Sequence, residues 1–152
     1  MADTDTKPLS MAPQASLFVI GHLRWDIYGD RAMTEVRRKA AALDRLSKLL
    51  KTLNDGPGPD FPRYYMLEGQ MSFIEEVADI RPDLQALILI FNAGGKLALG
   101  PWYTQIEETL VNSESLVRNL LLARVMAQRH GVKLANYAFM PSIRTHVRQL
   151  PQ

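Results

Sequence analysis

Short apolar runs alternate with stretches of helical periodicity along this chain, and this alternation constrains its fold more than any other feature. The runs cover residues 16–22, 63–67, 96–100 and 133–139. A helix-like stretch follows each of the first three runs, and alternating units of this kind predict parallel strands joined by helical crossovers. We therefore expect an α/β fold with four parallel strand–helix units, of which the last lacks its helix.

The helix-like stretches have recognisable faces and ends. Between residues 34 and 53 the apolar residues recur at spacings of three and four, which predicts one buried helix face formed by Val36, Ala40, Leu43, Leu46, Leu50 and Leu53. Further helices are expected over residues 70–79 and from Pro82 to the glycine pair at 94–95. The last should begin after a cap at Asn112 or Ser113 and end at Gly131.

Composition excludes several classes of function. The 152 residues suffice for one domain, and 18 Lys and Arg against 16 Asp and Glu give a net charge of only +2, too little to indicate a nucleic-acid partner. The chain contains no cysteine, which excludes disulfides, thiolate metal sites and a cysteine nucleophile and fits a reducing compartment. Residues 1–15 have no apolar core of a signal peptide, and no run is long enough to span a membrane. We expect a flexible tail over residues 1–15, a cytoplasmic location and no membrane partner.

Unusual loops follow the carboxyl ends of the expected strands, where parallel α/β folds place their sites. The loop after residues 96–100 contains Trp102, Tyr103, Glu107 and Glu108, and we expect these four side chains to line a substrate-binding cleft. Two alternatives stay open. The aromatic side chains could instead pack against one end of the sheet, and the two glutamates could form a solvated turn ahead of the next helix.

These loops, in this order, resemble the amino-terminal catalytic domain of the glycoside hydrolase family 38 α-mannosidases. The stretch "LEGQ" resembles the L-D-G-Q of that family, "IRPDL" resembles its I-R-P-E, and the ending "QLPQ" also matches. The strongest match is to the family pattern G-P-W-Y-x-Q-P-D-E-x-x-x-x-x-E-S-L-x-R-N-L-L. The matching positions are Gly100, Pro101, Trp102, Tyr103, Gln105, Glu108, Glu114, Ser115, Leu116, Arg118, Asn119, Leu120 and Leu121.

The resemblance implies that residues 16–152 form part of a distorted (β/α) barrel that acts on terminal α-mannosides. In the family one zinc ion grips hydroxyls of the terminal mannose. An aspartate attacks the anomeric carbon, and a second carboxyl group serves first as acid and then as base, which is the retaining mechanism.

The chain departs from the family at the zinc site. The family has H-x-H-x-D after its first strand, whereas this chain reads "HLRWD", so that His22 and Asp26 match and Arg24 replaces the ligand histidine. A guanidinium group has no lone pair to offer a metal ion. Asp26 is therefore the one retained zinc ligand, unless it pairs with Arg24, and His22 on its own is more typical of a structural hydrogen-bonding residue. We expect that this chain binds no zinc.

The substrate and nucleophile positions also differ from those of the family. Gly29 stands where the family has its tryptophan platform, and the adjacent Tyr28 is the candidate substrate contact there. Ser142 occupies the position of the nucleophilic aspartate, which in the family is also a zinc ligand, and the sequence offers no neighbouring base to activate its hydroxyl. No catalytic residue can therefore be assigned.

The sequence thus predicts an incomplete α-mannosidase-type glycoside hydrolase domain with impaired catalysis. The alternative is a non-enzymatic module derived from that fold, which binds carbohydrate or another protein, or a decayed gene product. Four strands supply only about half of what barrel closure needs. We therefore expect an uncovered apolar face of the sheet, hidden by self-association or by a partner that supplies the missing half.

Overall fold

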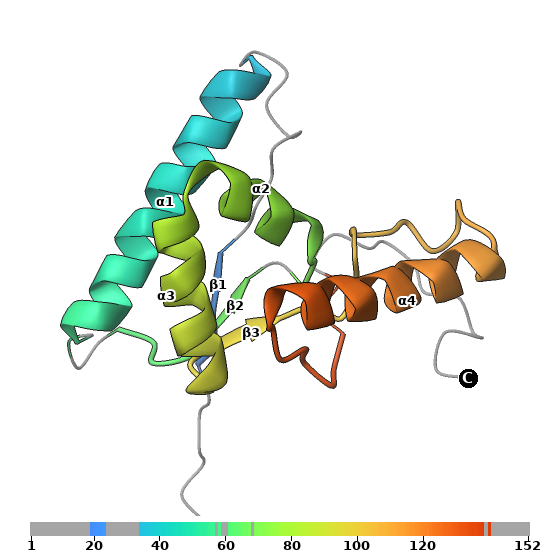
Figure 1. Cartoon of the computed structure of the whole chain (residues 1–152). Helices are drawn as coiled ribbons and strands as arrows, with labels where there is room; N and C mark the ends of the chain where they lie inside the picture. The colour runs from blue at the N-terminus through green and yellow to red at the C-terminus, as the bar shows by residue number, and fades with distance from the viewer. Residues whose placement is uncertain are drawn as a thin grey trace, which may run out of the picture.

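The computed structural model describes residues 19–23, 34–56, 58, 61–67, 69–138 and 140. The expected tail over residues 1–15 lies outside them. In chain order the described elements are β1 (Gly21–Leu23), α1 (Glu35–Asp55), β2 (Tyr65–Leu67), α2 (Ser72–Ile80), α3 (Pro82–Ala93), β3 (Leu97–Leu99) and α4 (Ser113–His130) (Figure 1). No described helix combines the length and the apolar character needed to cross a membrane.

The three strands form one parallel sheet in the order β1-β2-β3, which confirms the α/β class. In its register Gly21 pairs with Tyr65, and Tyr65 pairs with Leu97. Gly21 has no room for a side chain, because a Cβ atom there would overlap the Tyr65 ring. All three residues of β1 are only half-buried, because this strand lies at an edge of the sheet.

The fourth expected strand and the barrel are not formed by the described residues. Residues 133–138 have no strand conformation, although the Ala135 N–H donates to the Leu99 carbonyl at 2.8 Å and so holds this segment beside β3. The reason is visible at Lys133, whose N–H and C=O both bond to the side chain of Asn92. The segment is thus tied to a side chain of α3 at the point where a ladder with β3 would begin.

The first helix confirms part of its predicted face. Thr34 caps α1 by accepting a hydrogen bond from the Arg37 N–H, and Leu46, Leu50 and Leu53 are buried as expected. The two earliest positions of that face, at residues 36 and 40, are exposed instead. The cause is that the amino-terminal turns of α1 extend beyond the sheet and the other helices (Figure 1).

The two middle helices complete the core on the face of the sheet that α1 shares. Pro82 begins α3 as expected. Arg81, just before it, forms a bidentate salt bridge with Asp83, with Nε–Oδ1 and Nη2–Oδ2 distances of 2.8 and 2.7 Å. α3 contacts α1, α2 and β3. Leucine and isoleucine from the helices and the sheet make up about half of the core, and α4 adds two alanines. Its buried members include Leu46, Leu50, Leu67, Phe73, Ile74, Val77, Leu84, Ile88, Leu97, Leu99, Ala123 and Ala127.

The last helix has the ends that the sequence predicts. Asn112 is the cap of α4 and accepts a hydrogen bond from the Ser115 N–H at 2.8 Å, whereas Gly131 ends the helix in the left-handed conformation. The carboxyl-terminal end of α4 meets α3, where the Gln85 and His130 side chains lie 3.1 Å apart. From there α4 extends away from α1 (Figure 1), and only its inner side joins the core.

Candidate functional site

The loops that follow β2 and β3 are joined to each other at the carboxyl-terminal edge of the sheet. Gln70 and Trp102 form a parallel β-bridge. The Met71 N–H donates to the Trp102 carbonyl at 2.8 Å, and the Ser72 N–H donates to the Tyr103 carbonyl at 2.9 Å. Because these donors belong to the start of α2, the loop beginning at Gly100 lies across the first turn of that helix.

Side chains from separate family-like stretches reinforce this junction. The Gln70 side-chain oxygen, from "LEGQ", accepts a hydrogen bond from the Gln105 N–H at 3.0 Å. The Asn119 side chain on α4 accepts from the Tyr103 N–H at 2.8 Å and donates to the Thr104 carbonyl at 2.9 Å. Asn119 thus holds the loop after β3 against α4. Two of the stretches that resemble the family, "LEGQ" and the one from Gly100 to Leu121, therefore meet here and are joined by hydrogen bonds.

Tyr103 is fixed by its hydroxyl group as well as by its backbone. The Tyr103 hydroxyl donates to the Glu75 carboxylate at 2.6 Å. This hydrogen bond raises the pKa of Tyr103, and burial raises it further, so that the phenol stays protonated and acts as a donor at neutral pH. Sequence analysis missed Glu75, whose only signal is an acidic residue in the first turn of the helix after "EGQ".

Two of the predicted site residues are buried. Trp102 is 2% exposed and Glu108 is 1% exposed, whereas Tyr103 and Glu107 are half-buried. Burial of Glu108 shows that the alternative of a solvated acidic turn is wrong for this residue. Burial of Trp102 favours packing over an open cleft wall, and its contact with a sugar stays a prediction. In the described part of the chain the Trp102 indole N–H has no hydrogen-bond partner.

Gly100 allows the sharp departure of the loop from β3. Its φ angle is +76°, in the region that favours glycine, and a Cβ atom there would lie 2.5 Å from Cδ2 of Leu134. A cavity of about 350 Å³ lies beside this turn and is lined by residues that include Pro101, Leu120 and Arg124. The loop therefore borders open space on the side that faces α4.

The positions expected to hold zinc or to carry out chemistry lie mostly outside the described residues. Arg24, Asp26, Tyr28 and Ser142 are among them, and His22 is half-buried in the middle of β1. Among the residues that the structure describes, no three His, Asp or Glu side chains lie close enough together to hold a metal ion. Because Arg24 supplies no lone pair, the donor set of this chain does not fit the zinc site of the family. The absence of bound zinc stays a prediction.

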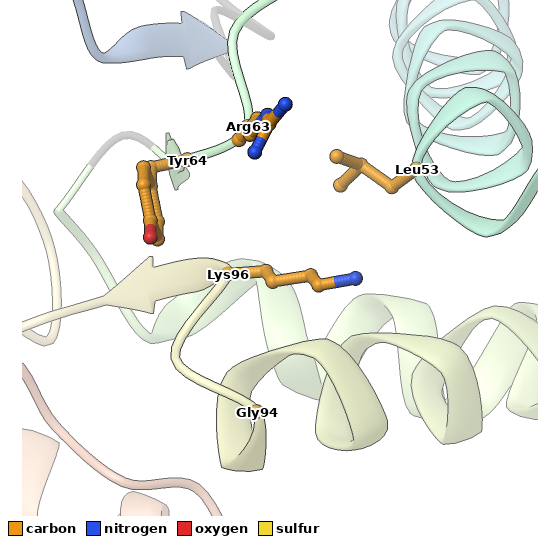
Figure 2. Close-up of a pocket in the computed structure, with 5 residues that line it drawn as sticks. All are labelled: Leu53, Arg63, Tyr64, Gly94 and Lys96. Carbon is orange, nitrogen blue, oxygen red and sulfur yellow. The ribbon is translucent and has the colours of Figure 1, made fainter. Parts of the chain in front are cut away.

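A separate pocket of about 390 Å³ lies at the amino-terminal ends of the strands, opposite the junction of the two loops. Figure 2 shows its lining residues Leu53, Arg63, Tyr64, Gly94 and Lys96. Arg63 and Tyr64 precede β2, and Lys96 precedes β3. Since the family-like loops follow these strands, the pocket is separate from the junction described above.

Asn92 is a second residue that sequence analysis missed. It is buried on α3, and its side chain donates to the carbonyls of Leu97 and Lys133 and accepts from the Lys133 N–H. The signal in the sequence is a single polar residue at the end of the apolar run "LQALILIF". This side chain positions the segment that follows α4 next to β3.

Known proteins resemble this chain in sequence and in fold. No family model matches the chain. A protein of Halalkalibacterium halodurans described as "Putative mannosylglycerate hydrolase" is 31% identical over 94 residues, which are 62% of this chain and 10% of that protein.

Two solved structures from Enterococcus faecalis have a similar fold. An α-mannosidase has a TM-score of 0.63 at 23% identity, covering 77% of this chain and 13% of its own. A protein of glycosyl hydrolase family 38 has a TM-score of 0.60 at 23% identity, covering 78% of this chain and 13% of its own. The chain thus spans only about a tenth of the length of these proteins. The fold is that of part of a glycoside hydrolase family 38 α-mannosidase, as the sequence resemblance indicated.

Proposed function

We propose that this chain is a partial α-mannosidase-type glycoside hydrolase domain, descended from enzymes that act on terminal α-mannosides, and that its own catalysis is impaired. One observation supports the proposal above the others. The Gln70–Gln105 hydrogen bond and the bonds from Asn119 to Tyr103 and Thr104 join the family-like stretches into one edge of a site. Residues that match a family pattern only by chance would not be expected to hold the backbone of another matching stretch in this way.

The substrate class comes from the relatives. The bacterial protein named as a mannosylglycerate hydrolase suggests a mannoside whose other half carries a carboxylate. The solved structure named as an α-mannosidase suggests the broader class of α-mannosides. We adopt the broader class for this chain, because the residues that would contact the other half of the substrate are not identified.

Impairment follows from the chemistry of the substituted positions. Retaining hydrolysis needs a carboxylate nucleophile and a second carboxyl group about 5–5.5 Å away. Ser142 stands at the nucleophile position without that charge, and Arg24 would place a positive charge at the zinc site. We derive no step through zinc, since the donor set does not fit it.

Hydrolysis of an aryl α-mannoside by the purified chain tests this proposal. We expect no release of the aryl group above the rate of the enzyme-free control. The double substitution Arg24→His with Ser142→Asp restores the family residues, and a gain of activity in that variant would support descent from an α-mannosidase. Activity in the unmodified chain that Ser142→Ala abolishes would show that the impairment is wrong.

Metal binding gives a second test of the same reasoning. Calorimetric titration of the chelator-treated chain with zinc should show no tight site, because Arg24 and Ser142 replace two ligand positions. The double variant is the matched comparison. A one-to-one site of micromolar or better affinity in the unmodified chain would contradict the proposal.

The second candidate function is a non-enzymatic module that binds carbohydrate or a protein. The observation that favours it is the buried Trp102 indole N–H, which has no acceptor among the described residues and could donate to a ligand hydroxyl. Titration with methyl α-mannoside, followed through the indole N–H resonance, tests this candidate. Trp102→Phe identifies the resonance, and an unchanged shift at saturating sugar would exclude the sugar-binding form of it. A cytoplasmic location stays a prediction.

A further inference from the structure

The outer side of α4 exposes a group of large apolar side chains. Val117 is 52% exposed, Leu121 is 54% exposed and Val125 is 57% exposed, and Leu120 and Leu122 flank them with smaller exposed fractions. A helix on the surface of a globular protein normally presents polar residues to solvent. An apolar surface of this kind marks a contact site.

This location differs from the one that the sequence predicted. We expected the uncovered apolar surface on the sheet, but no large apolar side chain within β1, β2 or β3 is exposed. Met66, which points to the face opposite the main core, is buried. Exposed apolar side chains occur just before the strands, at Val19, Ile20 and Tyr64, but no other helix gathers as many as α4 does among the described residues.

Helical geometry places the three most exposed residues in one stripe. Val117, Leu121 and Val125 are spaced four residues apart, so at about 100° per residue they follow one another along the same side of the helix. The buried residues Ala123 and Met126 lie on the opposite side. We call Val117, Leu121 and Val125 the α4 stripe.

Charged residues at the two ends of the α4 stripe are of opposite sign. Glu114 lies one turn before Val117 on the same side and bonds to Arg118 at 2.7 Å in an exposed pair, which contributes little to stability. Arg129 lies one turn after Val125, is exposed, and makes no ion pair in the part of the chain that the structure describes.

The α4 stripe is complementary to itself when the second helix runs in the opposite direction. In that arrangement Val117 of one copy lies opposite Val125 of the other, and Leu121 lies opposite its own counterpart. Glu114 then lies near Arg129 of the other copy, and the two-fold symmetry of the pair makes this contact twice. Opposite helix dipoles also favour the antiparallel orientation.

We propose that the α4 stripe is the contact surface for a second copy of this chain, packed antiparallel about Leu121. Glu114 argues for a second copy over anionic lipid, although Arg118 and Arg124 also flank the stripe, because Glu114 can bridge its own Arg118 and Arg129 of the other copy. One helix pair buries less area than the roughly 1,200–2,000 Å² of a stable interface. We therefore expect a weak, reversible dimer that is detectable at protein concentrations of tens to hundreds of micromolar.

Sedimentation velocity of the whole chain over that concentration range tests the proposal with paired charge variants. The unmodified chain should pass from monomer to dimer. Glu114→Arg alone and Arg129→Glu alone each turn both end contacts into like-charge contacts, so each variant should associate roughly tenfold more weakly than the unmodified chain. An equal mixture of the two variants should regain dimer, because both contacts between unlike variants are again of opposite sign.

Two further variants distinguish this contact from non-specific hydrophobic association. Leu121→Asp should abolish the dimer, whereas Val36→Asp, which removes an exposed apolar side chain from α1, should leave it unchanged. Circular dichroism melting confirms that each variant is folded. A chain that stays monomeric at the highest concentration, a mixture that does not regain dimer, or equal loss in the Val36 variant would overturn the proposal. Loss in Leu121→Asp without any effect of the charge variants would overturn the antiparallel pairing.

Discussion

Replacing Asn92 by alanine should weaken the chain more than its small change in volume suggests. The Asn92 side chain is 5% exposed and makes three hydrogen bonds, at 3.0 Å to the Leu97 carbonyl, 3.0 Å to the Lys133 carbonyl and 2.8 Å from the Lys133 N–H. At about 1 kcal/mol for each bond, the substitution should lower the free energy of unfolding by about 3 kcal/mol. Domains of this size are stable by only about 5–15 kcal/mol, so this loss is large.

Urea unfolding followed by circular dichroism measures the effect. With a slope of about 1–3 kcal/mol per molar urea, the Asn92→Ala midpoint should fall by roughly 1–3 M. Ile90→Ala, on an exposed position of the same helix, is the matched control and should change stability by less than about 0.5 kcal/mol. Hydrogen exchange of residues 132–138 should quicken in the Asn92 variant alone. Equal midpoints for the two variants would refute the reasoning.

Two further predictions concern the loop after β3. Because bonding to Glu75 raises the pKa of Tyr103, the hydroxyl should stabilise the fold fully below about pH 10, and this stabilisation should be lost as the pH rises through the raised value. Tyr103→Phe should therefore cost about 1–2 kcal/mol in urea unfolding at neutral pH, with a smaller cost at strongly alkaline pH. Gly100→Ala should cost about 0.5–1.5 kcal/mol more than Gly131→Ala, as measured by thermal unfolding, because both glycines have positive φ but only the first requires the end of the Leu134 side chain to move. Equal losses in the two glycine variants would show that Leu134 moves aside freely.

The sequence predicted those elements whose signals are local. The ends of α4 were predicted because Asn112 and Gly131 are a cap and a terminator wherever their neighbours lie in space. The exposure of Val36 could not be predicted, because it depends on where the sheet ends relative to α1. The absence of a fourth strand over residues 133–138 also depends on contacts between residues distant in sequence, since the hydrogen bonds of Lys133 are made with a side chain 41 residues away.

The candidate site divides in a similar way. Parallel strands place their following loops at one edge, so the meeting of the loops that contain Gln70 and Trp102 could be predicted. The burial of Trp102 and Glu108 could not be predicted, because a loop that lines a cleft and a loop that packs beneath one can have the same aromatic and acidic residues. The partner of Tyr103 was missed for a related reason, because Glu75 is one of several acidic residues near the start of α2.

The positions that match the family stabilise the loops, whereas those that depart from it are positions that would serve metal binding or the reaction. Gln70 and Asn119 bond to the backbone of the loop after β3, so removing either one leaves buried or half-buried donors without partners whether or not the chain acts on a sugar. A zinc ligand contributes to stability only when zinc is bound, and an unpaired carboxylate beside an empty site is unfavourable. By the family resemblance, Arg24 and Ser142 stand at positions that held such groups, and neither supplies one. A chain in which catalysis no longer constrains the sequence is therefore expected to keep the bonds that fold its loops and to lose the groups that serve only the reaction.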